Sequence, residues 1–287
     1  MRLGWKFWFV APMVLALSTV VLFPTIYLFW MSTQRWVVTN PPRRFAGFDN
    51  FARIFGREDF WQALGVTSIY LVLSTVLMIA LALGLALALS GARRGLLRAI
   101  VVMPFVIPPV VAGFTWRFLL NGEIGFVGAY LMPMIGFDVN LLAEPRAALV
   151  SVVIADVWSR FPFMFLIFLA ALQAVPRDLY EAARMDGANP IHEFLFVTVP
   201  MLSGAIFVSL LFRLIDAINA FELIYVMTKG GPGRATQVMS LYGWKLTFQE
   251  YDFGTAAALG VIMLVIAMIA AMMMFRRYQR SGLEMSR

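Results

Sequence analysis

The sequence contains no cysteine, one histidine and few charged residues. The absence of cysteine from the 287 residues excludes disulfides, thiol catalysis and metal sites built on thiolates. The single histidine, His192, cannot build a histidine-rich metal site alone. Charged residues make up 14% of the chain and hydrophobic residues 61%, more than the roughly one half of an ordinary soluble domain. These values indicate a membrane protein.

Long apolar runs recur along the whole chain. Each is about 20 residues or longer, enough to cross a hydrocarbon core of about 30 Å. The runs do not alternate apolar and polar residues, so they favour helices over the strands of a β-barrel. The sequence therefore predicts an all-α, polytopic membrane protein with six transmembrane helices, roughly at 7–31, 63–89, 97–120, 147–174, 200–227 and 255–275.

The N-terminal run has a second reading as a secretory signal peptide. It is too long for the apolar region of such a peptide, and no small-residue cleavage site follows it. We therefore predict an uncleaved first span. Several spans contain proline or glycine, above all the stretch MPFVIPPVVAG at 103–113, and helices bend at such positions.

The formal charge of +7 also has two readings. In a soluble protein it would suggest nucleic acid, but here basic residues flank the predicted spans, where they contact lipid headgroups. We expect membrane lipid and no nucleic acid as a partner. Basic residues are divided almost equally between the two faces, so charge counting does not settle the topology. The clusters ARRGLLR at 92–98 and FRRYQR at 275–280 favour cytoplasmic termini.

The segments between the spans are short. With both termini inside, the outer segments are 32–62, 121–146 and 228–254, and none is long enough for an independent soluble domain. No internal repeat or low-complexity linker is visible. We predict a single transmembrane domain over residues 1–287.

A polar segment at 175–199 interrupts the apolar runs. Its stretch VPRDLYEAARMDGA is typical of a short amphipathic helix, with Pro176 near the start, where a missing N–H costs little. Asp178 and Glu181 lie early, where the helix dipole favours negative charge. Gly187 suits a left-handed C-terminal cap. Such a helix is too short and polar to span, so we expect it at the membrane surface, facing a partner.

The same segment resembles the EAA loop of ABC importer permeases, which normally reads EAA-x3-G-x9-I-x-L-P. Here EAA at 181–183 is followed after three residues by Gly187, and after nine more by VTVP at 197–200. Valine replaces the isoleucine and the leucine, a mild apolar departure. A short EAA match alone is weak, but the full spacing between two apolar runs is specific.

Further segments carry the resemblance over most of the chain. FAGFDNF (45–51), DVWSRFPF (156–163) and LQAVPRDLYEAARMDGA (172–188) are similar to segments of carbohydrate-type permeases. FELIYVMTKGGPGRAT (221–236) is similar to the first subunit of the maltose-type system. The resemblance implies a type I ABC importer permease fold in the bacterial inner membrane, with both termini and the EAA loop in the cytoplasm.

The resemblance also implies a coupling role and a set of partners. In that family the EAA helix docks into a cleft of an ATP-hydrolysing subunit; here Glu181 would pair with a basic residue of that ATPase, and Gly187 would set the turn. The implied coupling residues are Glu181, Ala182, Ala183, Asp186 and Gly187. The implied partners are a second homologous permease subunit in a heterodimer, an ABC ATPase dimer, and a periplasmic or lipid-anchored solute-binding protein.

The energy source is not expected in this chain. A P-loop reads G-x-x-x-x-G-K-[ST], whereas GGPGRAT at 230–236 lacks the terminal lysine and hydroxyl residue. We expect no cofactor here, with ATP and Mg bound by the partner ATPase. We also expect no catalysis by this chain.

Ionisable residues inside predicted spans are costly and mark functional sites. Several polar residues of the fourth span recur at helical spacing on one face, and the fifth span carries Arg213 and Asp216. In the maltose-type permease, which this chain resembles, these two faces line the sugar site. The implied substrate-path residues are Asp156, Ser159, Arg160, Phe163, Arg213, Asp216, Ala217 and Ala220. Carboxylates accept hydrogen bonds from sugar hydroxyls, arginines donate, and a phenyl ring offers stacking area.

The charged residues have a structural alternative. Asp156 with Arg160, and Arg213 with Asp216, are four and three residues apart and are also suited to form structural ion pairs. Two arginines hint at an anionic sugar derivative or glycerol phosphate. Two aspartates cancel that charge, so a neutral oligosaccharide or polyol stays open.

The sequence thus predicts a permease subunit of an ATP-driven importer for a sugar or sugar-like solute. One alternative is a secondary transporter driven by an ion gradient, marked by uncompensated carboxylates and inverted repeats, which would leave the EAA loop unexplained. Another is an intramembrane enzyme, which needs a nucleophile with a base or a metal cluster. The lack of cysteine and the single histidine on a loop oppose it.

Overall fold

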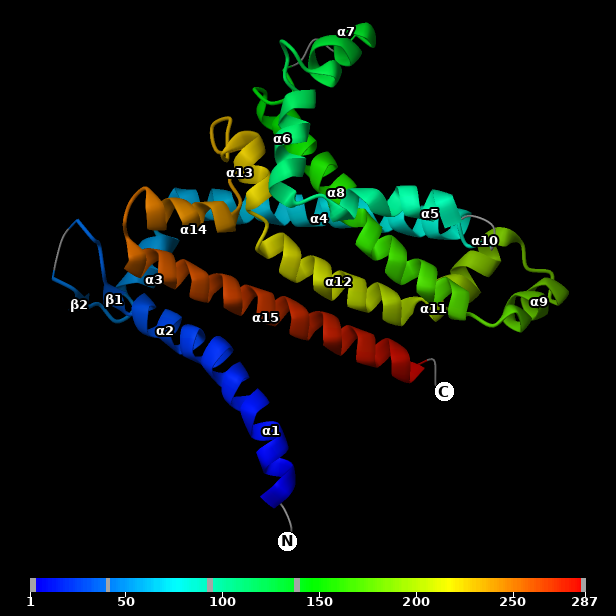
Figure 1. Cartoon of the computed structure of the whole chain (residues 1–287), viewed down its shortest axis with the longest axis horizontal. Helices are drawn as coiled ribbons and strands as arrows, with labels where there is room; N and C mark the ends of the chain where they lie inside the picture. The colour runs from blue at the N-terminus through cyan, green and yellow to red at the C-terminus, as the bar shows by residue number, and fades with distance from the viewer. Residues whose placement is uncertain (1–3, 40–41, 92–94, 137–139, 285–287) are drawn as a thin grey trace. The chain divides into compact units, whose positions relative to one another are not determined.

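A computed structural model describes residues 4–39, 42–91, 95–136 and 140–284 (Figure 1). Part of the basic cluster predicted at 92–98 lies outside the described residues, because these omit 92–94.

The first half of the chain forms α1 Gly4–Leu17, η1 Ser18–Leu22, α2 Phe23–Ser32, β1 Gln34–Arg35, β2 Arg44–Phe45, α3 Asp49–Phe55, α4 Glu58–Ala88, α5 Gly95–Val102, η2 Met103–Val106, α6 Pro109–Leu119, η3 Phe126–Leu131 and α7 Met132–Met134. The second half forms α8 Pro145–Ala174, α9 Arg177–Met185, α10 Pro190–Glu193, η4 Phe194–Thr198, α11 Val199–Met201, α12 Ser203–Ile218, α13 Glu222–Thr228, α14 Met239–Phe248 and α15 Phe253–Glu284.

Four helical stretches are long and apolar enough to cross a membrane: Trp8–Ser32, Glu58–Ala88, Pro145–Ala174 and Phe253–Arg280. Two bent pairs also qualify: Gly95–Val106 with Pro109–Leu119, bent by 96°, and Pro190–Met201 with Ser203–Ile218, bent by 65°. If each bent pair is one span, the described chain has six. The predicted all-α polytopic fold class is confirmed.

The third span bends where its prolines cluster. The α-helix gives way to the 3-10 turn η2, and Ile107 and Pro108 are extended, with ψ of 124° and 140°. Pro108 and Pro109 cannot donate a backbone hydrogen bond, so the helix cannot continue through them. The bend predicted from the stretch 103–113 is confirmed.

The fifth span differs from the predicted continuous helix at 200–227. The helix α12 ends at Ile218, and α13 begins separately at Glu222. The Ile215 carbonyl accepts two hydrogen bonds from Asn219, one from its backbone N–H at 3.3 Å and one from its side-chain amide at 2.8 Å. Asparagine is a poor helix former, and here it marks the end of the span.

Packing divides the chain into two compact units, each assembled from separate segments. The first contains Met1–Trp61 and Leu241–Ile266, and the second contains Gln62–Ser240 and Ala267–Arg287. In the first unit the buried Asn50 donates to two backbone carbonyls of the α2–β1 connection, at 2.7 and 2.8 Å. Arg53 donates to the side-chain oxygen Oδ1 of Asn50 at 3.3 Å and pairs with Asp252 at 3.2 Å, just before α15. These bonds give the segment FAGFDNF a structural role.

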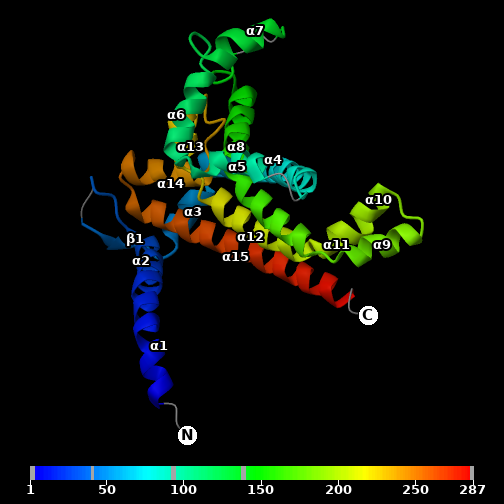
Figure 2. The same cartoon turned by 45° about the vertical axis from the view of Figure 1, so that its right-hand side comes forward.

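In the second unit α8 is the most deeply buried span. It packs against α6, α12 and α13, and most of its apolar stretch is buried (Figure 2). The tightest approach is between α6 and α13, where a Cβ at Gly113 would lie 3.0 Å from the Val226 side chain. Glycine lets these two helices meet closely. Both helices also pack against α8.

Candidate functional site

The EAA loop, residues 175–199, begins with the nine-residue helix α9. Pro176 is its N-cap, with φ −60° and ψ 134°, and Asp178 lies in the first turn beside the positive end of the helix dipole. The predicted amphipathic helix is confirmed. Figure 2 shows α9 and α10 side by side, next to the end of α8.

The helix α9 ends in a left-handed glycine cap. Gly187 has φ +82°, which the sequence had suggested. Its N–H donates to the Arg184 carbonyl at 3.0 Å, and the N–H of Ala188 donates to the Ala183 carbonyl at 2.9 Å. This pair of bonds is a Schellman motif, which turns the chain sharply back.

A second helix start follows directly. The Asn189 side chain accepts from the His192 N–H at 2.9 Å, and Pro190 is the first residue of α10. Arg184 of α9 holds Glu193 of α10 through two bonds of 2.8 and 3.2 Å. The two helices are therefore clamped together as one rigid protrusion.

Sequence reasoning did not find the bonds that stiffen the EAA loop. Besides the Arg184–Glu193 pair, the Tyr180 hydroxyl lies 3.1 Å from the Thr198 hydroxyl, which ties α9 to η4. The dipeptide Asn189-Pro190 was a signal for the second helix start, because asparagine followed by proline is typical of an N-cap and a first helical position.

Three of the predicted coupling residues lie together on one side of the protrusion, where they line a hollow of about 380 Å³. Its lining residues are Ala183, Asp186, Gly187, Ala188, His192, Phe196 and Val197. Glu181, Ala182, Asp186 and Gly187 are exposed, and Ala183 is half-buried. Among the described residues, Glu181 takes part in no salt bridge. The loop thus offers an exposed carboxylate at Glu181 and, separately, a shallow hollow.

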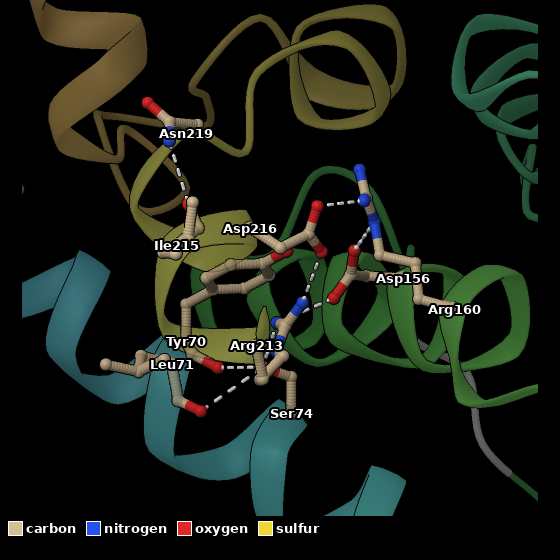
Figure 3. Close-up of polar contacts among 9 residues, drawn as sticks. All are labelled: Tyr70, Leu71, Ser74, Asp156, Arg160, Arg213, Ile215, Asp216 and Asn219. Atoms are coloured by element: carbon tan, nitrogen blue, oxygen red, sulfur yellow. Dashed lines mark hydrogen bonds and ion pairs between the residues drawn. The ribbon is translucent and has the colours of Figure 1, made fainter. Parts of the chain in front are cut away.

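The four charged residues of the fourth and fifth spans form a closed ring, here called the ion-pair ring. Asp156 lies 2.9 Å from Arg160 through Oδ1 and 2.8 Å from Arg213 through Oδ2. Asp216 contacts Arg160 through Oδ1 and Arg213 at 3.2 Å through Oδ2. Each arginine contacts both aspartates, and each aspartate contacts both arginines through different oxygens (Figure 3).

The ion-pair ring joins α8 and α12, and α4 supports it. The Arg213 guanidinium donates to the Ser74 hydroxyl of α4 at 2.6 Å and lies 5.3 Å from the centre of the Tyr70 ring (Figure 3). Sequence reasoning missed Ser74 and Tyr70. Their signal was weak but present: two polar residues four apart, on one face of a mostly apolar span.

Burial divides the ion-pair ring into an inner and an outer half. The side chains of Asp156 and Arg213 are 1% and 2% exposed, whereas Arg160 is 22% and Asp216 37% exposed. The outer half borders a cavity of about 210 Å³, lined by Met78, Phe105, Arg160, Phe163, Met164, Ser209, Phe212, Arg213 and Asp216. Ring faces supply much of its wall, since Phe163 stacks on Phe105 and meets Phe212 edge-on, with centroids 5.7 and 5.4 Å apart.

The predicted substrate-path residues therefore fall into two groups. Arg160, Phe163, Arg213 and Asp216 line the cavity together. The others, which are Asp156, Ser159, Ala217 and Ala220, are buried and do not line it. For the charged residues, the sequence left two roles open, which are to line the path and to form structural ion pairs. The structure shows both arrangements. Within the described ranges, no group of three acidic or histidine side chains is placed to hold a metal ion.

Taken together, the helical fold with four to six candidate membrane spans and the rigid exposed loop between α8 and α12 define a polytopic membrane permease. The chain belongs to the family of binding-protein-dependent transport system inner membrane components, whose model matches residues 78–283. The family and the apolar spans place the chain in a cell inner membrane.

Two similar proteins and one solved structure show how far the likeness extends. The chain is 37% identical to a trehalose/maltose transport system permease protein of Thermococcus litoralis, over 93% of each chain. It is 31% identical to a sulfoquinovosyl glycerol transport system permease protein of Agrobacterium fabrum, over 90% of this chain and 85% of that one. A chain of a bacterial ABC transporter involved in import of the acidic polysaccharide alginate matches with TM-score 0.81 and 24% identity, over 96% of each. That structural match supports the fold alone.

Proposed function

We propose that this chain is the permease subunit of an ATP-driven ABC importer that moves a sugar or sugar-like solute by alternating access. The observation that carries the proposal is the EAA loop: a rigid protrusion with an exposed, unpaired Glu181 connects the two helices that border the cavity. The similar proteins named for trehalose/maltose and sulfoquinovosyl glycerol transport support a sugar-like solute.

The connectivity provides a route for coupling. The EAA loop follows α8 directly and leads into α12, and the ion-pair ring joins these two helices beside the cavity. A displacement of α9 would therefore move both cavity-bordering helices together, because a clamped loop transmits motion without bending. ATP-driven closure of a partner ATPase at Glu181 would open the path outward, and hydrolysis would return it inward.

The proposal includes partners and a topology. A second homologous permease would complete the path, two ATPase subunits would bind the EAA loops in the cytoplasm, and a solute-binding protein would dock on the outer side. Both termini would be cytoplasmic. ATP and Mg would be bound by the ATPase, so this chain would bind no cofactor and catalyse no covalent step.

The ion-pair ring favours this function over an ion-driven secondary transporter. Such a transporter is expected to use buried carboxylates that lack a compensating charge. Asp156 and Asp216 are each compensated by two arginines. A carboxylate held in this way is poorly suited to exchange a proton or sodium ion during each cycle.

Reversing the charge of Glu181 tests the coupling role. Glu181→Lys should reach the membrane in normal amount, yet lower transport and transport-coupled ATP hydrolysis by about tenfold or more, because it places like charges at an interface. Uptake and ATP hydrolysis are measured with the purified complex in proteoliposomes, with trehalose as the probe. Glu123→Lys, a reversal at an exposed glutamate outside the EAA loop, is the control and should behave as the native chain. Normal coupled uptake by Glu181→Lys would contradict the proposal.

A further inference from the structure

Among the described residues that line the cavity, the charged ones all belong to the ion-pair ring. Of its nine lining residues, three are ionisable: Arg160, Arg213 and Asp216. The fourth member, Asp156, lies behind them and is 1% exposed. Two arginines and two aspartates give the ion-pair ring a net formal charge of zero, so an incoming solute meets no net charge there.

The charge of each arginine is compensated by two carboxylates. Arg213 is engaged by Asp156, Asp216 and Ser74, and Arg160 by the same two aspartates. A phosphate or sulfonate that took the place of either carboxylate would leave that carboxylate in a largely apolar cavity without its partner. Breaking a buried pair in this way is strongly unfavourable.

We propose that this cavity selects uncharged polyhydroxyl groups and rejects anionic ones, with Asp216 as the specificity-determining residue. This inference rests on the proposed function, because it assigns the cavity to the solute path. Asp216 is the most exposed member of the ion-pair ring and is held in place by both arginines. An ionised carboxylate is a pure acceptor, so its exposed face is suited to sugar hydroxyls and opposed to phosphate or sulfonate oxygens.

The rest of the cavity wall matches the same class of solute. Phe105, Phe163 and Phe212 present ring faces and edges beside Asp216, and a pyranose ring has apolar faces that pack against them. The volume of about 210 Å³ lies below the roughly 300–1,000 Å³ of sites for drug-sized ligands. The cavity in this conformation therefore encloses one ring-sized group and not a whole oligosaccharide.

A single cysteine can report the charge of the cavity, because the chain has none of its own. Phe163→Cys places a thiol in the cavity wall, one helical turn from Arg160, where Cβ atoms are about 5–6 Å apart. In membranes that contain the assembled complex, the thiol is treated with anionic and cationic methanethiosulfonate reagents of similar size. Mass spectrometry of this chain gives the rate of labelling by each reagent. The anionic-to-cationic ratio of these rates is then divided by the same ratio for a free thiol.

With the ion-pair ring intact, this ratio should lie within about threefold of one, as for a neutral surface. Asp216→Asn in the same background should raise the anionic-to-cationic ratio by about tenfold or more, and Arg160→Gln should lower it by a similar factor. A merely structural ring would not produce opposite shifts. A ratio tenfold or more above one in the intact ring would overturn the proposal. Phe105→Cys, at a neighbouring wall position, repeats the measurement in case Phe163→Cys does not assemble.

Protection of the same thiol tests the class of solute. Trehalose should slow labelling of the cysteine introduced by Phe163→Cys, whereas sulfoquinovosyl glycerol should not. In the same background, Asp216→Asn should remove the protection by trehalose. Protection by the sulfonate, or by neither compound, would overturn the proposal. Labelling requires no ATP, so this test does not depend on coupling. If the cavity passes it while Glu181→Lys transports normally, the coupling proposal fails and the proposal for the cavity stands.

Discussion

At the scale of single residues, the ion-pair ring shows how four charges are tolerated in an apolar bundle. Asp156 and Arg213 are almost fully buried, and each of them contacts two residues of opposite charge. A buried charge is costly unless it is both paired and hydrogen-bonded. Ser74 supplies one of the additional hydrogen bonds from α4. Asp156 is therefore structural, whereas Arg213, although buried, lines the cavity together with Arg160 and Asp216.

Substitution of the two aspartates should separate these halves. Asp156→Asn deprives the buried Arg213 of a charged partner and should lower the free energy of unfolding by about 3–5 kcal/mol. Asp216→Asn should cost less, because at 37% exposure solvent screens its pairs. Thermal unfolding of the purified complex in detergent measures both.

A paired replacement provides the control for this comparison. Asp156→Leu with Arg213→Met removes both buried charges and should recover much of the lost stability, since apolar residues of similar volume avoid the desolvation cost. Equal destabilisation by Asp156→Asn and Asp216→Asn would contradict the division into two halves.

At the scale of elements, the EAA loop is a helix–turn–helix clamped at several points. The Schellman turn at Gly187, the N-cap at Asn189 and the Arg184–Glu193 pair follow one another within about ten residues. A loop so constrained moves as one body, which is what a coupling element requires. The turn depends on a left-handed residue, and only glycine adopts that conformation without strain.

Alanine at Gly187 should strain the turn and weaken coupling. Gly187→Ala and Gly136→Ala are a matched pair, because their φ angles are +82° and +80° and an added Cβ meets nothing within 4 Å at either position. Each should cost about 1–2 kcal/mol of backbone strain. Only Gly187→Ala should lower uptake per ATP hydrolysed in proteoliposomes. An equal loss of coupling from Gly136→Ala would show that the effect is general destabilisation.

Elements also show where sequence patterns fail. The long apolar runs predicted the spans well, because length and composition suffice for a helix that must satisfy its own backbone in lipid. The fifth span was predicted too long, since most residues of α13 are also apolar and hydropathy does not reveal the break between the two helices at 219–221. The ion-pair ring was only partly foreseen. Spacing along each helix suggested Asp156–Arg160 and Arg213–Asp216, but the pairs between helices depend on how α8 meets α12.

At the scale of the whole molecule, much apolar surface is left uncovered by the chain itself. None of the apolar window of the span Trp8–Ser32 is buried, and only 17% and 22% of the windows of the spans Phe253–Arg280 and Glu58–Ala88 are buried. Lipid or further subunits must cover these faces. The family of binding-protein-dependent transport components is consistent with an assembly of several chains.

Purification from the native membrane tests that assembly. In mild detergent the chain should bring with it a P-loop ATPase and a second permease with its own EAA loop, identified by mass spectrometry. Gly187→Pro should release the ATPase and keep the second permease, because it disrupts the turn and not the spans. Glu123→Lys, outside the EAA loop, should keep both. Purification of a lone chain or a homo-oligomer that transports without ATP would contradict the proposed function.

By itself, the sequence determined the class of protein, the presence of several apolar helices long enough to cross a membrane, and the local conformation of the EAA loop, including its left-handed Gly187. These properties depend on hydrophobic length and on hydrogen bonds between near neighbours. Only the tertiary structure decided that two arginines and two aspartates close into a neutral ring, that Ser74 joins them from α4, and that four of the eight predicted path residues line one cavity. Contacts between distant helices depend on their packing, and no spacing along one helix encodes it.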